Sequence, residues 1–406
     1  MATQDVQQLI DKLAARLQRS VTVTDPEIRI IAASAHYGDE DEARVRAVLA
    51  RVALPAVYRH IHSFGVRNWT APGVIPAQSA LGFKQRFVVP VRRGSTLLAL
   101  LMVIDEHASD TDASGSTPIE GAAHALSSLL DTEHEEQQRQ KSRRSQLLAD
   151  LLSDHPCTRD RAVAEAAEVL GAPAEHAVMM TMVLGTRRAT VTDHLELIVD
   201  AGMVNVQMRE GSQLAYDLHG RTATIASLSD RSPSESEIRA HAQRLRHSVL
   251  SLLEPDWDAV IGISGASVDL TSLRAAHRRA QLAAEAATLL PQFTPVASCS
   301  DLGVFATLLR LPASDLDDAI PTAVHRLHEN DSHGVHLETL RAYLDAAGSI
   351  PVTSQRLNLH RTSLYYRLNQ IEKVVGTSLR DGTTRLTLHL GLEAMRLQQA
   401  RNSRAD

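Results

Sequence analysis

The sequence has few aromatic residues, only two cysteines and no long apolar run. Aromatic side chains make up 3% of the 406 residues, so we expect cores built from aliphatic side chains. Cys157 and Cys299 are too few for a disulfide framework and, on their own, for a zinc site, which is typical of a reducing compartment. The longest apolar run, residues 97–104, is far shorter than the roughly 20 residues that span a membrane, and the N-terminus lacks the pattern of a signal peptide. We therefore expect a cytoplasmic protein that does not enter a membrane.

A general excess of basic residues is also missing, because the formal net charge is -6. Basic side chains nevertheless gather between Arg356 and Arg385, where six bases and two acids give +4, which leaves -10 for the rest of the chain. The distribution therefore predicts an acidic body with a basic C-terminal segment, and such a segment suits a polyanionic partner.

The patterning predicts an α+β protein of several domains. Residues 1–130 and 155–312 each mix strand-like and helix-like segments, whereas residues 313–406 have helical patterns throughout. Between the first two lies 131–154, and its first part, 131–146, contains no aliphatic or aromatic residue, no glycine and no proline. We expect this linker to be a helix that joins two domains and could serve dimerisation; a solvated linker without a signalling role is the alternative.

The expected elements follow the apolar periodicity. In the first domain we expect a helix over 6–17, strand pairs over 21–34 and 86–105 with turns at 25–26 and 93–94, and a closing helix at 119–130. In the second we expect strands over 178–185 and 258–264, a hairpin over 213–228, and helices over 234–253 and 272–290. The last region should hold helices over 313–330, 337–346, 351–358, 360–374 and 384–400.

Helix 360–374 is the most informative of these. At about 100° per residue, four aliphatic side chains form one narrow stripe: Leu364, Leu368, Ile371 and Val375. Upstream lies a short helix with Ser349 as a candidate cap and Pro351 in its first turn. A third apolar face precedes it, formed by Leu337, Leu340, Tyr343 and Leu344. Three short helices with a tight connection between the last two predict a helix-turn-helix.

Polar and cationic side chains occupy the face opposite the stripe. Arginine can bond guanine or phosphate in a bidentate manner, amides can read adenine, and hydroxyl groups can hold phosphate oxygens. A solvated amphipathic helix in a bundle would explain any one of these residues, but together they predict binding to double-stranded DNA. The candidate DNA-binding residues are Arg361, Thr362, Ser363, Tyr366, Arg367, Asn369, Gln370 and Lys373.

Three motifs in this region resemble the C-terminal DNA-binding domain of the PucR/CdaR-like transcription factors, the purine catabolism regulator family. They are TLRAYL at 339–344, HRTSLYYRL at 360–368 and RLTLHLGL at 385–392. Ser363 stands where the family usually has threonine, and Ser354 where it usually has alanine. Both changes exchange small residues, so they leave the expected fold intact and bear on base preference.

The same resemblance implies a degenerate GGDEF-like domain before the tail, and the layout of 155–312 is similar to one. No Gly-Gly-Asp/Glu-Glu-Phe signature is present, and the nearest segment, 209–212, lacks the catalytic carboxylates. We therefore expect no nucleotide cyclisation there. The layout of 1–130 is similar to a GAF-type sensor domain.

Several other residues could be read as ligand-binding sites, but their patterns favour structural roles. The four histidines at 325, 328, 333 and 336 could bind a metal, but the stretch has no cysteine and few carboxylates, so we expect no metal site. His60 and His62 are expected to be ordinary core or surface residues. Gly262 and Gly265 are expected to mark a turn rather than a phosphate loop, and His360 and His389 to make hydrogen bonds within their domain.

These observations together predict a sequence-specific DNA-binding transcriptional regulator that responds to an unidentified small-molecule effector and acts as a homodimer or higher homo-oligomer. We expect neither an enzymatic activity nor a cofactor. One alternative is a signalling protein that processes or binds a nucleotide through the GGDEF-like middle domain. Another is a scaffold whose basic tail binds a second protein.

Overall fold

A computed structural model describes residues 2–50, 53–106, 116–170, 175–186, 195–210 and 213–405. The chain divides into two units. The first comprises 1–259 and 266–277, and the second comprises 260–265 and 278–406. The domain boundaries at 130, 154 and 312 remain predictions, because this division follows compactness alone.

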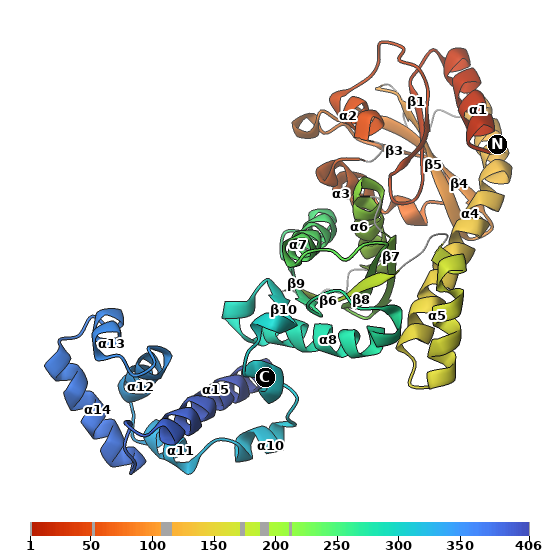
Figure 1. Ribbon diagram of the computed structural model, residues 1–406. Helices are drawn as coiled ribbons and strands as arrows, with labels where there is room; N and C mark the ends of the chain where they lie inside the picture. Colours follow the sequence, from red (N-terminus) through yellow and green to blue (C-terminus); the bar gives the residue numbers. More distant parts are fainter. Residues whose placement is uncertain are drawn as a thin grey trace. The chain divides into compact units, whose positions relative to one another are not determined.

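The first unit begins with a five-stranded antiparallel sheet in the order β2-β1-β5-β4-β3 (Figure 1). Its strands are β1 (Val21–Thr24), β2 (Ile30–Ala33), β3 (Gly73–Ile75), β4 (Arg86–Arg93) and β5 (Thr96–Ile104). Both expected strand pairs are confirmed, with Thr22 paired to Ala33 and Arg86 to Ile104. Every residue from 98 to 104 is buried, as the all-apolar run predicted.

Helices cover both faces of this sheet. On one face, α1 (Ala2–Leu17) packs with α4 (Ser116–Leu152) over side chains such as Val6, Ile10 and Leu126. On the other face lie α2 (Glu42–Ala50) and α3 (Pro55–Ser63), with Tyr58 and Ile61 in the core. Neither α2 nor α3 was predicted from the sequence, because α2 has only a weak amphipathic pattern and α3 is short.

The polar segment 131–146 is helical, as expected, and lies within α4. It packs on its own unit: Ser145 Oγ donates a hydrogen bond to Tyr216 O at 3.1 Å, and Lys141 Nζ lies 3.2 Å from Asp200 Oδ1. Leu147, Leu148 and Leu151, just beyond the segment, are buried within the unit. The apolar side chains next to the polar segment are therefore buried in the core of their own unit.

A second five-stranded sheet has the order β10-β9-β6-β8-β7. The hairpin of β7 (Gln213–His219) and β8 (Thr222–Ser229) turns at Gly220, where φ is +59°. β8 pairs antiparallel with β6 (His176–Thr186), and β9 (Trp257–Ile263) pairs parallel with β10 (Val296–Ser298). The helices of this region are α5 (Pro156–Leu170), α6 (Leu195–Glu210), α7 (Glu235–Leu252) and α8 (Leu273–Leu289). Helices α5 and α6 were not predicted from the sequence. Of the segment 209–212, the nearest to a GGDEF signature, residues 211–212 lie outside the described residues.

Gly262 lies inside β9, and its lack of a side chain has a packing reason. A Cβ there would be 2.0 Å from Ala284 N and 2.2 Å from Ala280 O, so only glycine allows α8 to approach the strand this closely. Gly265 follows in a bend with φ of +102°. The two glycines therefore serve a close approach and a turn.

The rest of the second unit is helical. The segments are α9 (Phe305–Leu308), α10 (Ala313–Asp318), α11 (Thr322–Glu329), α12 (Val335–Asp345), α13 (Ile350–Arg356), α14 (Arg361–Val375) and α15 (Gly382–Ala405). The prediction of a single helix over 313–330 is wrong. Pro321 separates α10 from α11, because a proline lacks the N–H group and its ring clashes with the preceding turn. Within the part of the chain that the structure describes, no helix is long and apolar enough to cross a membrane.

Candidate nucleic-acid interface

Helices α12, α13 and α14 form the expected three-helix arrangement (Figure 1). Pro351 lies in the first turn of α13, as predicted, and Ser349 is at the cap position. The Ser349 hydroxyl, however, makes no capping hydrogen bond; instead Thr353 Oγ1 donates to Ser349 O at 2.7 Å. Asn358 has a φ of +51° in the turn that joins α13 to α14. This left-handed residue lets the chain reverse within a few residues.

Local hydrogen bonds define the ends of α14. His360 is the N-cap, and its Nδ1 atom accepts from the N–H of Thr362 and lies 2.5 Å from Thr362 Oγ1. At the other end Gly376, with a φ of +80°, donates its N–H to Glu372 O at 2.8 Å. The expectation that His360 bonds within the domain agrees with this geometry.

The predicted apolar stripe of α14 is buried. Leu364 and Ile371 are fully inaccessible, Leu368 is 6% exposed and Val375 is 2% exposed. All four belong to the core of the second unit, where α14 packs on α11 and α12. This burial fixes the rotation of the helix, so the opposite face must point outward.

Most of the predicted DNA-binding residues lie on that outer face. Tyr366 is 66% exposed, and Arg367 and Gln370 are half-buried. Tyr365, which was not among the predicted contacts, is 54% exposed. The remaining predicted residues are all exposed: Arg361, Thr362, Ser363, Asn369 and Lys373.

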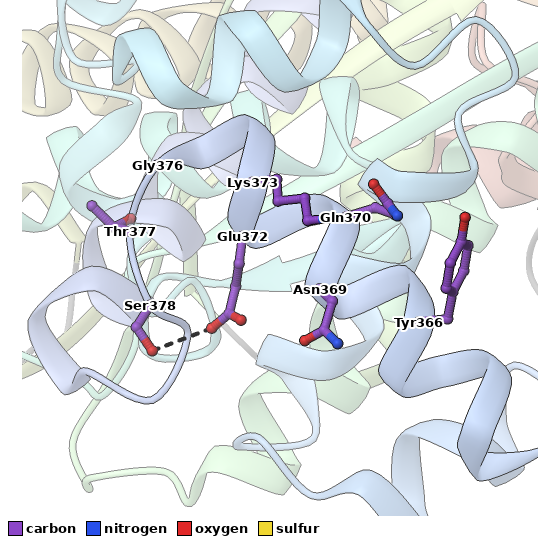
Figure 2. Close-up of a pocket in the computed structure, with 8 residues that line it drawn as sticks. All are labelled: Tyr366, Asn369, Gln370, Glu372, Lys373, Gly376, Thr377 and Ser378. Atoms are coloured by element: carbon purple, nitrogen blue, oxygen red, sulfur yellow. Dashed lines mark hydrogen bonds between the residues drawn. The ribbon is translucent and has the colours of Figure 1, made fainter.

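Two depressions flank Tyr366. The larger, about 600 Å³, is bounded by α14 and by the segment that follows it (Figure 2). Figure 2 shows Tyr366, Asn369, Gln370 and Lys373 on α14. Glu372 also lines this depression; its Oε1 atom accepts hydrogen bonds from Ser378 Oγ at 3.2 Å and from the N–H of Leu379 at 2.7 Å. The carboxylate thus holds the connecting segment against the helix.

The smaller depression, about 460 Å³, lies between the start of α12 and the start of α14. Its lining includes Thr362, Ser363 and Arg367 from the predicted set, and His336 from α12. Three lining residues were not predicted from the sequence: His336, Thr377 and Ser378. Their positions depend on how neighbouring segments pack against α14, which apolar periodicity does not reveal.

The cations of this surface differ in their surroundings. Arg367 Nη1 donates to Thr339 Oγ1 at 3.4 Å, which anchors that side chain to α12. Arg356 is paired with Asp345 at 3.1 Å. Within the ranges that the structure describes, Arg361 and Lys373 have neither an ion-pair nor a hydrogen-bond partner, so both remain available to a ligand.

One group of side chains has the composition of a metal site. Ligand atoms of Asp345, His389 and Glu393 lie within 4.8 Å of one another. His389 Nε2 is 3.1 Å from Asp345 Oδ1, which agrees with the expected structural role of His389.

Three guanidinium groups surround these carboxylates. Arg356 pairs with Asp345, while Arg341 and Arg396 lie 3.9 Å and 3.8 Å from Glu393. Because arginines already neutralise both carboxylates, the group is best described as an ion-pair network that ties α12 and α13 to α15. The four histidines at 325–336 form no such group among the described residues.

Comparisons with known proteins agree with this geometry. The family model of the PucR C-terminal helix-turn-helix domain matches residues 336–394, from α12 into α15. The purine catabolism regulatory protein of Bacillus subtilis (strain 168) is 37% identical over 92 residues, which are 22% of this chain and 17% of that protein. The DNA-binding transcriptional activator AdeR of the same organism is 19% identical over 410 residues, covering 96% of this chain and 92% of AdeR.

A solved structure, the regulator of polyketide synthase expression from Bifidobacterium adolescentis, is 14% identical with a TM-score of 0.30. The match covers 64% of this chain and 99% of that one. The helix-turn-helix motifs, the match to 336–394 and the relatives lead to one statement: residues 336–394 form a helix-turn-helix domain of the PucR C-terminal type.

Proposed function

We propose that the protein is an effector-responsive, sequence-specific regulator that places α14 in the major groove of DNA. The observation that carries this proposal is the rotation of α14. Its aliphatic stripe is buried, and the opposite face presents Arg361, Tyr366 and Lys373 to solvent. A cationic, hydroxyl-rich helix of this size fits the major groove.

The residues of α14 divide by the chemistry that they can supply. Arg361 carries a guanidinium without an internal partner, so it can bond a guanine edge in a bidentate manner. Asn369 and Gln370 have the amide groups that pair with adenine. Lys373, Arg367 and the hydroxyls of Thr362 and Ser363 suit backbone phosphates, which fix register but do not read sequence. Tyr366 lines both depressions.

The upstream regions would supply control. In this proposal the GAF-like region 1–130 binds the small-molecule effector, and the GGDEF-like region 155–312 mediates assembly. One helix-turn-helix makes few base contacts, so specific sites usually contain two half-sites about one helical turn apart. A homodimer is therefore part of the proposal. Segment 131–146 offers only polar surface to such a dimer, because the leucines that follow it are buried within their own unit.

The experiment that tests DNA binding begins with duplexes selected from a random library by the full-length protein. Replacing Arg361 by alanine should weaken binding of the selected duplex about 10- to 100-fold, the cost of one bidentate base contact. Gel retardation measures the loss, and circular dichroism checks the fold. Arg310→Ala, which removes an exposed arginine away from α14, is the matched control.

Two outcomes would contradict the proposal. Equal retention by Arg361→Ala and the wild type would remove Arg361 from the contacts, and a wild type that selects no duplex would remove DNA binding itself. The nucleotide-processing alternative is tested by incubating the full-length protein with GTP and magnesium and separating the products by chromatography.

A further inference from the structure

We propose that α12 forms part of the DNA-binding surface: His336 joins Thr362, Ser363 and Arg367 in a site for a phosphodiester oxygen of the DNA backbone. This inference rests on the proposed function and extends the interface beyond the two helices of the helix-turn-helix. The site is the 460 Å³ depression between the first turns of α12 and α14. Its lining combines an imidazole, two hydroxyls and a guanidinium, all of which can donate hydrogen bonds to an anion.

The orientation of α14 adds to this site. The depression is at the N-terminal end of a 15-residue helix, where backbone N–H groups of the first turn have no acceptor within the helix. The N–H of Thr362 is already directed to His360 Nδ1, which leaves the neighbouring N–H of Ser363 for a ligand. The partial positive charge of a helix N-terminus favours phosphate at the same place.

Arg367 is held toward the depression by a buried threonine of α12. Thr339 is fully buried, and its hydroxyl donates to Val335 O at 2.7 Å. The same oxygen accepts a hydrogen bond from Arg367 Nη1 at 3.4 Å. Thr339 is thus a positioning residue, which orients the guanidinium without touching DNA.

The charge around the depression also suits an anion. Among the described residues that line it, none carries a carboxylate. The carboxylate of Asp331 lies 3.9 Å from His336 Nδ1, but its side chain is only 4% exposed and it accepts a hydrogen bond from the N–H of Leu337 at 2.8 Å. That carboxylate is turned toward the start of α12. The larger depression on the other side of Tyr366 differs, because Glu372 lines it.

The inference is tested on the full-length protein with two fluorescent duplexes, one selected by the wild type and one of scrambled sequence. A phosphate contact carries no sequence information, so His336→Ala should weaken binding of both duplexes by a similar factor, about five- to tenfold. His333→Ala, which removes an exposed histidine of the same stretch that does not line the depression, is the matched control and should bind as the wild type.

Thr339 provides an independent measurement. Thr339→Val removes the hydroxyl with little change in volume and should weaken binding of both duplexes, whereas Thr339→Ser keeps the hydroxyl and should restore wild-type affinity. Arg367→Ala should also lower the slope of log affinity against log salt by about one, the value for one lost phosphate contact. Unfolding curves establish that each variant is folded.

The outcomes separate the two proposals. If Arg361→Ala weakens binding of the selected duplex while His336→Ala and Thr339→Val bind both duplexes as the wild type does, the α12 site is overturned and the proposed function stands. If His336→Ala weakens only the selected duplex, the residue reads bases and the phosphate assignment is wrong. If the wild type selects no duplex from the random library and does not bind the scrambled one, both proposals fail.

Discussion

Glu27 has an unusual environment for a carboxylate. It is 8% exposed in the turn between β1 and β2, close to the carboxylate of Asp25. Burial and the charge of Asp25 raise the pKa of Glu27 from 4.5 to about 7. Two guanidinium groups lower this pKa but do not cancel the rise: Arg29 Nη2 lies 3.2 Å from Glu27 Oε2, and Arg67 Nη1 lies 3.6 Å from Glu27 Oε1. The charge of this side chain therefore changes near neutral pH.

This shift predicts how stability depends on pH. Because the pKa of Glu27 is higher in the folded than in the unfolded chain, the folded state binds more protons between about pH 4.5 and pH 7. The free energy of unfolding should therefore decrease as pH rises through this range, by about 3 kcal/mol from this residue, and level off above it. Glu27→Gln should flatten that part of the profile in urea unfolding experiments.

An exposed carboxylate of the same unit gives the comparison. Glu254→Gln should leave the pH profile of the wild type unchanged. A profile of Glu27→Gln that keeps the full wild-type slope over this range would show that Glu27 is ionised in the folded protein at lower pH than expected.

At the scale of elements, the turn between α13 and α14 is set by one residue. Asn358 has a φ of +51° and is exposed, and the N–H of Leu359 next to it donates to Ser354 O at 2.9 Å. Asparagine tolerates the left-handed conformation better than most residues, and β-branched residues tolerate it poorly. The spacing of the two helices therefore depends on this position.

Replacing Asn358 by valine should lower the free energy of unfolding by about 1–2 kcal/mol, because a β-branched side chain is strained at positive φ. Asn358→Gly, which adopts this conformation freely, should stay close to the wild type. Thermal unfolding of the two variants measures the difference. Equal stability of the valine and glycine variants would mean that the turn rearranges at little cost.

Elements with a regular apolar period could be predicted from the sequence. The apolar stripe from Leu364 to Val375 predicted α14 and the face of this helix that points outward. The apolar strands predicted the β4–β5 hairpin. The break between α10 and α11 was not predicted, although the sequence contains Pro321 there, because the apolar periodicity continues on both sides of this proline. His336 and the Thr339–Arg367 bond were not predictable, because they depend on how α12 lies against α14.

At the scale of the second unit, the helix-turn-helix shares one core with segments outside the family domain. Buried residues of this core extend from Ala283 in α8 to Leu397 in α15. The match at 336–394 thus covers only part of it. The segment from α10 to α11 supplies four of its buried aliphatic side chains: Leu316, Ile320, Val324 and Leu327.

We therefore expect the fragment 336–394 to lack a cooperative unfolding transition, whereas 313–406 should retain one. The four buried side chains of the segment from α10 to α11 are worth about 6–12 kcal/mol at the usual 1.5–3 kcal/mol for each. That is comparable with the entire stability of a typical domain, about 5–15 kcal/mol. Urea titration followed by far-ultraviolet circular dichroism distinguishes the two fragments. A sharp transition of 336–394 at the midpoint of 313–406 would mean that the three helices α12–α14 with the start of α15 hold their own core, and that α10 and α11 only cover it.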